Sequence, residues 1–203
     1  MPSESTVFII DDDHEVREAI ALLMQSIGLP FQSYESAQAY LDTFDPQALG
    51  CLVLDVRMKG MSGLALQNHL KTLPMSPPVI IITGHGDVPM AVQAVKNGAS
   101  DFIEKPFKEQ ILLDSIHLAI EKDAEQRGKA LIKEEIQKKL NLLTPRELEV
   151  IEQVVTGKRN KTIAKELNIT ISTVEAHRSK GMEKLQAKSL SHLMRMIISL
   201  KKL

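Results

Sequence analysis

Three short apolar runs, each followed at once by polar residues, constrain the fold of this chain more than any other feature. The runs occupy residues 7–10, 51–54 and 79–82. A short run that is apolar at every position is typical of a strand buried on both faces of a parallel sheet. Two weaker strand candidates are Phe31–Tyr34 and Asp101–Glu104.

Between these runs, apolar residues recur at helical spacing. They are Val16, Ile20, Leu23 and Ile27, then Leu64, Leu66 and Leu70, then Val88, Val92 and Val95. Gly28 is a suitable C-terminal stop for the first of these helices. A chain that alternates strand and helix in this way builds a parallel sheet through right-handed crossovers. We therefore predict an α/β domain with a doubly wound, five-stranded parallel sheet of the flavodoxin-like kind.

Polar side chains follow the predicted strands, at the sheet edge where open α/β folds place their sites. They are Asp11, Asp12, Asp55, Thr83 and Lys105. Clustered carboxylates repel one another, and Mg²⁺ would relieve this repulsion because it prefers oxygen ligands. One carboxylate could then attack a phosphoryl group whose charge the metal and the lysine neutralise, while the threonine hydroxyl donates to the product. Any one of these residues also fits an ordinary turn or surface position. The prediction of a phosphoryl-transfer site therefore rests on all five occurring together, each at the end of a predicted strand.

The residues around these positions resemble the receiver domain of two-component systems over about residues 5–122. The matching segments are Ile10-Asp11-Asp12-Asp13, Leu54-Asp55-Val56-Arg57-Met58, Ile82-Thr83-Gly84 and Lys105-Pro106-Phe107. The resemblance implies that Asp55 accepts a phosphoryl group. It also implies that Asp12 holds Mg²⁺, with Asp11 acting through water, and that the backbone carbonyl of Arg57 contacts the metal.

The same resemblance assigns roles around the phosphoryl group. Lys105 contacts that group and is followed by a cis peptide bond to Pro106, an isomer that only an X-Pro bond adopts cheaply. Thr83 moves toward the phosphoryl group and Phe102 follows as the aromatic part of a switch. The sequence departs from the family at Lys59, where a proline is common. We expect this change to alter the lifetime of the phosphoryl group without removing the chemistry.

The charge distribution divides the chain into two parts. Residues 140–203 carry 12 Lys and Arg against 6 Asp and Glu, whereas residues 1–139 carry 13 against 20. A basic C-terminal part is compatible with a nucleic-acid partner, and equally with a solvated basic surface. We expect a receiver domain over residues 1–122, a helical linker over 123–140 and a second domain over 141–203. The linker is either a dimer-forming helix or a solvated tether, since its apolar stripe is too short to diagnose a coiled coil.

The C-terminal part has the helix start and stop signals of a small helical domain. Thr144-Pro145-Arg146-Glu147 has the pattern of a capping box with proline at the first helical position. Further helices are expected over residues 160–167, from 171 to Leu185 and from 190 to 200, with Ile171 and Val174 facing the core. A tight turn at Asn168 joins the second and third helices. Two helices joined in this way, with a polar and basic outer face, are typical of a module that enters the DNA major groove.

These helices resemble the LuxR-type four-helix domain, and the whole chain resembles response regulators of the FixJ and NarL type. By this resemblance, the residues that face bases are Glu175, Ala176, Ser179 and Lys180. Those assigned to phosphates are Asn160, Lys161, Thr173, His177, Arg178 and Lys188. Phosphate contacts position a protein on DNA and base contacts specify the sequence. Glu175 also fits an ordinary solvated position, and His177 a packed one.

The sequence therefore predicts a response regulator that a sensor histidine kinase phosphorylates, with Mg²⁺, to control homodimerisation and binding to double-stranded DNA. RNA polymerase is a further candidate partner. Two alternatives stay open: a DNA-binding regulator that acts without phosphorylation, and a phosphatase that forms an aspartyl phosphate. The second alternative lacks the further aspartate that such phosphatases usually have two residues after the nucleophile, where this chain has Arg57.

No membrane span is expected, because no apolar stretch approaches about 18 residues. Residues 1–6 lack the basic start of a secretory signal. The single cysteine, Cys51, suits a reducing compartment and is interpreted as a small core residue, with redox sensing as the alternative. These features predict a cytoplasmic protein that is not an enzyme beyond its own slow phosphorylation and dephosphorylation.

Overall fold

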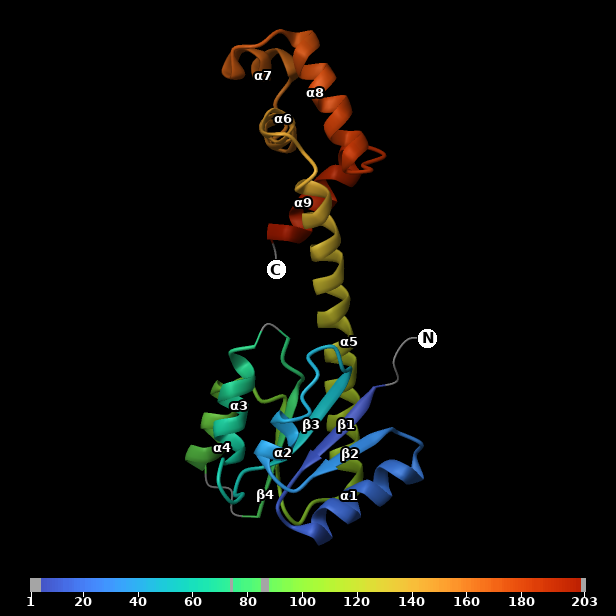
Figure 1. The fold of residues 1–203 in the computed structure, drawn as a ribbon, viewed down its shortest axis with the longest axis vertical. Helices are drawn as coiled ribbons and strands as arrows, with labels where there is room; N and C mark the ends of the chain where they lie inside the picture. The colour runs from blue at the N-terminus through green and yellow to red at the C-terminus, as the bar shows by residue number, and fades with distance from the viewer. Residues whose placement is uncertain (1–4, 74, 85–87, 202–203) are drawn as a thin grey trace. The chain divides into compact units, whose positions relative to one another are not determined.

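The predicted apolar runs form one parallel sheet in a computed structural model, which describes residues 5–73, 75–84 and 88–201. The strands are β1 (Thr6–Ile10), β2 (Phe31–Tyr34), β3 (Gly50–Asp55), β4 (Val79–Thr83) and β5 (Asp101–Glu104). Their order is β2-β1-β3-β4-β5, and every neighbouring pair is parallel (Figure 1). The order changes direction between β1 and β3, and open α/β folds place their sites beyond the carboxyl ends of the strands at such a point. The prediction of a five-stranded, doubly wound α/β fold is confirmed.

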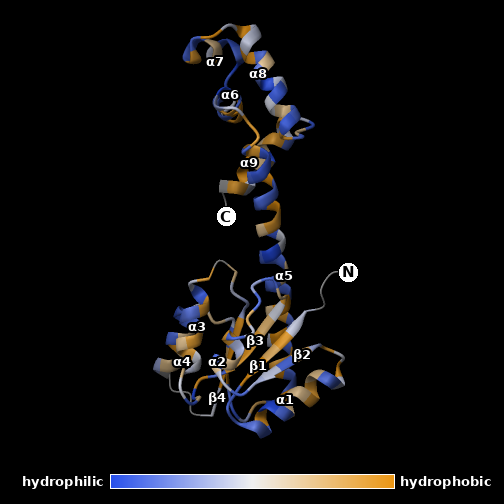
Figure 2. Ribbon diagram, in the orientation of Figure 1, coloured by the Kyte–Doolittle hydropathy of each residue, from blue (hydrophilic) through white to orange (hydrophobic). Residues whose placement is uncertain are grey.

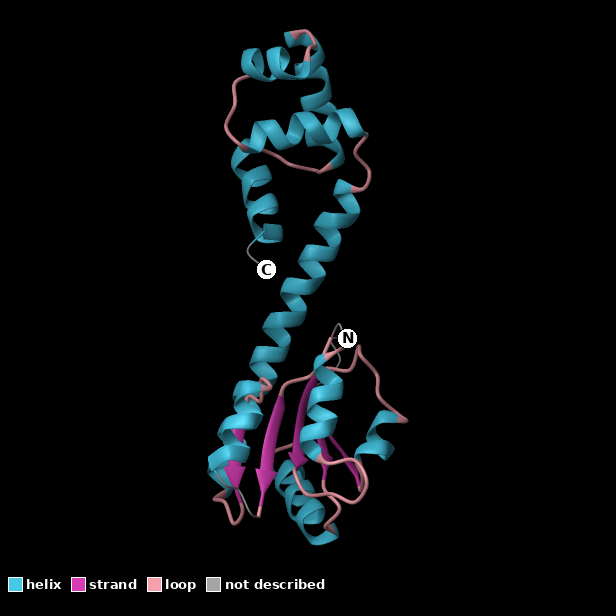
Figure 3. Cartoon of the chain, turned by 90° about the vertical axis from the view of Figure 1, so that its left-hand side faces the viewer, coloured by secondary structure: helices cyan, strands magenta, loops and turns pink. Residues whose placement is uncertain are grey.

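Helices cover both faces of this sheet (Figure 3). One face packs against α1 (His14–Ser26) and the first part of α5 (Glu109–Leu140). The other packs against α2 (Ala37–Leu41), α3 (Gly63–Lys71) and α4 (Val88–Lys96). Successive strand side chains point to opposite faces, so Ile9 and Ile10 enter different cores. The interior positions of the central strands are therefore apolar toward both faces, as the orange colouring of much of these strands in Figure 2 shows.

The helical spacing located the helices better than it located their buried faces. Ile27, Val92 and Val95 are 42%, 45% and 60% exposed, although all three belong to the apolar patterns that predicted α1 and α4. Among the α4 residues whose burial the structure describes, 89–96, the buried one is Ala94. The helix presents this small residue to the sheet and leaves Val92 and Val95 on the surface.

A buried ion pair ties the middle of α5 to the receiver-like unit. Asp123 accepts a hydrogen bond from the Gly50 backbone N–H at 3.0 Å, and its carboxylate pairs with Arg127 at 2.9 Å. The Arg127 guanidinium also donates to the Pro46 carbonyl at 2.8 Å. Both charged side chains are buried, at 2% and 7% exposure. The contacts of the chain separate into units that meet at Arg127 and Gly128, within the linker predicted for 123–140.

The second unit is built from α6 (Pro145–Val155), α7 (Asn160–Leu167), α8 (Ile171–Lys184) and α9 (Leu190–Lys201). Thr144 and Glu147 form the predicted capping box. The core includes Val150 and Val174, together with Ile136 from the last part of α5. The expectation that Ile171 faces this core is wrong: it is 45% exposed, because it begins α8 at the open end of the helix.

Among the described residues, no helix is both long enough and apolar enough to cross a membrane. Most of the segment examined for a secretory signal, residues 1–4, lies outside the described residues. Cys51 is fully buried in β3 with no disulfide partner, and burial raises the pKa of its thiol to about 12. Its environment is that of a core residue.

Candidate functional site

Three aspartates converge at the carboxyl ends of β1 and β3. One carboxylate oxygen from each of Asp11, Asp12 and Asp55 lies within 4.8 Å of the others. Asp11 and Asp55 are buried, at 1% and 5% exposure, while Asp12 is exposed. They meet because β1 and β3 are adjacent and parallel, with Ile10 beside Leu54 in the register. The next residues, Asp11 and Asp55, therefore lie side by side at the carboxyl edge of the sheet.

Lys105 brings a positive charge into this acidic cluster from the end of β5. Its Nζ lies 2.6 Å from Asp11 Oδ2 and 2.8 Å from Asp55 Oδ1. Burial acts to lower the pKa of Lys105, but the hydrogen bonds to the two carboxylates and their negative charges together outweigh it and raise that pKa above its usual value. Burial also raises the pKa of Asp11, more than the Lys105 hydrogen bond lowers it. The site therefore holds one ammonium group shared by two buried carboxyl groups.

The backbone around Asp55 fixes the orientation of its carboxylate. The Arg57 N–H donates to Asp55 Oδ2 at 2.6 Å, so both carboxylate oxygens have a partner. Gly63 lies directly against this turn, and its N–H donates to the Val56 carbonyl at 3.0 Å. A Cβ atom on Gly63 would lie 2.0 Å from the Asp55 carbonyl oxygen. The sequence analysis missed this requirement for glycine, although the Ser62-Gly63 pair just ahead of a helical pattern was a signal that could have found it.

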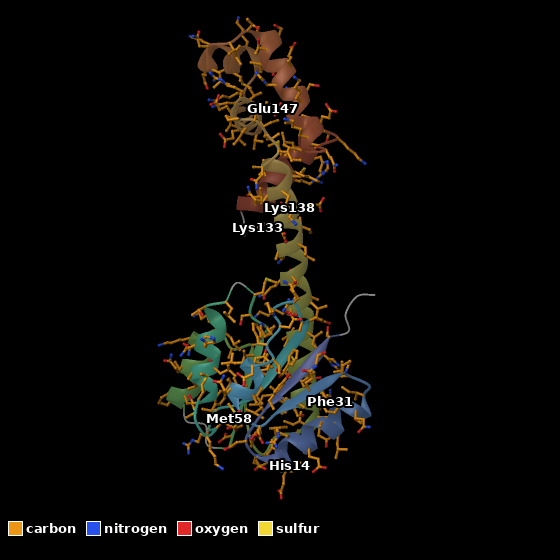
Figure 4. All side chains as sticks on the ribbon, in the orientation of Figure 1. His14, Phe31, Met58, Lys133, Lys138 and Glu147 are labelled. Atoms are coloured by element: carbon orange, nitrogen blue, oxygen red, sulfur yellow. The ribbon has the colours of Figure 1, made fainter. Side chains whose placement is uncertain are left out.

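The other predicted receiver residues lie on β4 and β5. Thr83 is the last residue of β4 and is buried, and its carbonyl accepts from the Lys105 N–H at 2.8 Å. Phe102 is partly buried on β5 and packs against the core beneath α4. The Lys105–Pro106 peptide bond is cis. In Figure 4, His14 and Met58, which follow the ends of β1 and β3, lie at the same edge of the unit.

The donor set of the acidic cluster suits a hard divalent cation. Three carboxylates offer oxygen ligands, and Mg²⁺ binds through one or two carboxylates while keeping several waters. The exposed Asp12 borders solvent, where such waters would remain. The position of the Arg57 carbonyl as a fourth ligand stays a prediction.

In the helical unit, α7 and α8 form a helix-turn-helix. Asn168 ends α7 in the left-handed conformation, with φ of 52°, and Thr170 caps α8 by accepting from the Thr173 N–H at 3.1 Å. The predicted base-facing residues on α8 are all exposed: Glu175, Ala176, Ser179 and Lys180. Of the predicted phosphate-facing set, the exposed residues are Lys161 and Lys188, and the half-buried ones are Asn160, Thr173, His177 and Arg178.

Polar contacts hold these helices together. Asn160 at the start of α7 donates to Glu175 Oε1 at 3.4 Å and accepts from Arg178 at 3.2 Å. Behind α8, Lys184 Nζ lies 2.6 Å from the buried Glu147 carboxylate, which also accepts from the Thr144 N–H at 2.9 Å. The Lys184 hydrogen bond is the main reason that the pKa of Glu147 falls to about 2. Figure 4 labels Glu147 within this unit.

Comparison with known families matches both parts of the chain. The response regulator receiver domain matches residues 7–117, and the luxR family of bacterial regulatory proteins matches residues 141–197. The first match contains the acidic cluster, and the second contains α7 and α8.

Relatives match over nearly the whole length. The transcriptional regulatory protein FixJ of Azorhizobium caulinodans is 43% identical over 198 residues, which are 98% of this chain and 94% of that protein. The response regulator protein TodT of Pseudomonas putida is 43% identical over 97% of this chain and 87% of its own length. The solved structure of the response regulator StyR is similar with a TM-score of 0.85 and 40% identity, covering 96% of this chain and 98% of StyR. The chain thus belongs to the two-component response regulators that join a receiver domain to a LuxR-type DNA-binding domain.

Proposed function

We propose that a sensor histidine kinase transfers a phosphoryl group to Asp55 of this protein and thereby controls DNA binding by the LuxR-type domain. The observation that carries this proposal is the contact of Lys105 Nζ with Asp55 and Asp11 inside a cluster of three carboxylates. The Asp55 carboxylate can act as the nucleophile. The neighbouring ammonium group of Lys105 would stabilise the negative charge of the phosphoryl group during and after its transfer.

Asp11, Asp12 and Asp55 would hold Mg²⁺, which when bound supplies positive charge for the oxygens of the transferring group. Phosphorus exchanges its bond to the kinase histidine nitrogen for one to an Asp55 carboxylate oxygen. Lys105 would contact the new phosphoryl oxygens, since its Nζ already lies 2.8 Å from Asp55 Oδ1. The Thr83 hydroxyl donates to the same group. Water hydrolyses the acyl phosphate and returns the carboxylate and inorganic phosphate, and we expect this step to be slow.

Thr83 and Phe102 are proposed to carry the signal from the phosphoryl group to the face formed by α4, β5 and α5. Phosphorylation would bias this two-state element. The exposed apolar side chains on that face support a role in homodimerisation: Val92, Val95, Ile111 and Leu118. Covering them with a second copy of the chain would remove apolar surface from water.

We propose that α8 enters the major groove with the base-facing and phosphate-facing residues predicted above. The exposure of Ser179 and Lys180 supports direct contact, whereas Glu175 would first have to exchange its weak contact with Asn160 for a cytosine amino group. A dimer would place two such helices on adjacent half-sites and so increase affinity and specificity. We propose that the protein acts in the cytoplasm, where RNA polymerase is a further partner.

The test is selection of genomic fragments by the purified full chain with Mg²⁺, with and without acetyl phosphate. Asp55→Asn removes the acceptor, and Asp42→Asn is the matched control because Asp42 is exposed at the end of α2, outside both the acidic cluster and the face formed by α4, β5 and α5. Fragments enriched only after treatment, by the wild type and the control but not by Asp55→Asn, would support the proposal. Equal enrichment in all samples would mean that DNA binding does not need phosphorylation. Absence of enrichment in every sample would contradict the DNA-binding part.

A further inference from the structure

A cavity of about 210 Å³ lies at the edge of the receiver sheet opposite Asp55, beside the amino ends of β4 and β5. Its walls come from α3, from the segment that leads into β4, from the segment between α4 and β5, and from α5. None of the residues proposed above for phosphorylation or DNA binding lines it. Any role for the cavity is therefore separate from that chemistry.

The residues around this cavity include those whose polar side-chain atoms the fold buries without a partner. Among the described residues these atoms are Gln67 Oε1, Asn97 Nδ2 and Ser100 Oγ, and all three residues line the cavity. A buried polar atom without a hydrogen bond costs about 1–3 kcal/mol, so such atoms are rare and call for a partner. Three of them in one cavity indicate that a polar occupant supplies the missing hydrogen bonds.

The neighbouring contacts fix which kind of atom each group presents. Gln67 is only 3% exposed and donates through Nε2 to the Ala94 carbonyl at 3.0 Å, so its free end is the acceptor Oε1. The Asn97 Oδ1 accepts from Gln93 at 2.9 Å, so its free end is the donor Nδ2. With the Ser100 hydroxyl, the residues around the cavity hold an unpartnered acceptor, an unpartnered donor and a group that does both, each within the cavity wall.

Two lysines give the cavity a positive rim. Lys71 of α3 and Lys122 of α5 both line it, and neither has an ion-pair partner among residues 5–73, 75–84 and 88–201. Both side chains are exposed, so their ammonium groups attract anions from solvent and carry no desolvation penalty. The volume is below the roughly 300–1,000 Å³ of sites for drug-sized ligands, which restricts the occupant to a small molecule.

We propose that this cavity binds a small organic anion that also carries a hydroxyl group, the chemistry shared by hydroxycarboxylates and polyol phosphates. Small side-chain rotations in the wall let the ligand O–H donate to Gln67 Oε1, and let a ligand oxygen accept from Asn97 Nδ2 and from the Ser100 hydroxyl. The anionic group contacts the two lysines. Because Gln67 also joins α3 to α4, a bound ligand stabilises the packing of these helices.

The test is calorimetric titration of the full chain at constant ionic strength with glycerate, glycerol 3-phosphate, inorganic phosphate and uncharged glycerol. The first two should bind saturably, and more tightly than phosphate or glycerol. Lys122→Met and Ser100→Ala should each weaken binding about tenfold, since each removes one charge-assisted or buried hydrogen bond. Lys108→Met makes the same charge change at an exposed position outside the cavity and should leave affinity unchanged, as should Asp55→Asn.

Three results would overturn the proposal. The first is no saturable heat for either hydroxylated anion. The second is binding that is equal for glycerol, or that Lys122→Met and Ser100→Ala leave unchanged. The third is a crystal structure grown with glycerate in which only water molecules contact Gln67, Asn97 and Ser100. Because Asp55→Asn is titrated in parallel, failure here is distinguishable from failure of the proposed phosphorylation.

Discussion

The buried pair of Asp123 and Arg127 makes a quantitative prediction about the stability of the receiver. Replacing Asp123 with alanine leaves the Arg127 guanidinium, only 7% exposed, without its carboxylate and leaves the Gly50 N–H without its acceptor. Removing one partner of a buried ion pair costs about 3–5 kcal/mol. We therefore expect Asp123→Ala to reduce the free energy of unfolding of the receiver by about 4 kcal/mol.

Tyrosine fluorescence during urea unfolding measures this change in the full chain. Both tyrosines, Tyr34 and Tyr40, lie in the receiver, and the sequence has no tryptophan, so the signal reports this unit alone. With a slope of about 2 kcal/mol per molar urea, a loss of about 4 kcal/mol lowers the midpoint by about 2 M. Glu121→Ala is the control, because Glu121 is an exposed carboxylate on the same helix.

A double-mutant cycle separates the pair from the loss of each side chain. Once Asp123 is gone, Arg127 has lost its compensating charge, so removing it by Arg127→Met should cost far less than it costs in the wild type. The double variant should therefore be much more stable than the sum of the two single effects predicts. A cost below about 1 kcal/mol for Asp123→Ala, or strict additivity, would refute the argument that a buried pair fixes this part of α5.

Four further predictions follow from contacts described above. Lys180→Met should weaken DNA binding and reduce the salt slope of log K by about 1, whereas Arg146→Met, with the same charge change on α6, should not; electrophoretic mobility shifts over a salt series decide this. The folded pKa of Glu147, about 2, lies below its ordinary 4.5, so its stabilising contribution is present above pH 4.5 and is lost as the pH falls toward 2. Thermal melts followed by circular dichroism should show that Glu147→Gln removes this part of the acid dependence. Cys51 should react with a thiol reagent at pH 8 only after denaturation, because its pKa is raised to about 12; rapid labelling of the native chain would contradict the core assignment. Gly63→Ala should destabilise the receiver and slow its phosphorylation by acetyl phosphate, since the added Cβ has to displace the backbone of the acceptor turn.

The sequence was sufficient to predict the receiver cluster because one physical rule connects the strands to the site. Parallel strands end at the same edge, so Asp11 and Asp55, 44 positions apart in the numbering, were expected to meet. The capping box at Thr144 is equally local, since both partners lie within one helical turn. Apolar spacing was a weaker guide to burial. It could not distinguish a stripe that packs on the sheet from one that faces solvent, as Val92 and Val95 do.

Features that depend on long-range contacts could not be predicted in the same way. Asp123 meets the Gly50 N–H across 73 positions, and nothing near either residue marks the other as its partner. The segment around Asp123 was therefore assigned to a linker, either a dimer-forming helix or a solvated tether, because charged residues in a helix are usually exposed. Its burial changes the interpretation of the linker: a helix anchored by an ion pair at Asp123 and contributing Ile136 to the second core is not a free tether at either end. Between Asp123 and Ile136, α5 can change its conformation without unfolding either core. If α5 transmits a signal, substitutions in this segment should alter DNA binding without altering the urea midpoint of the receiver.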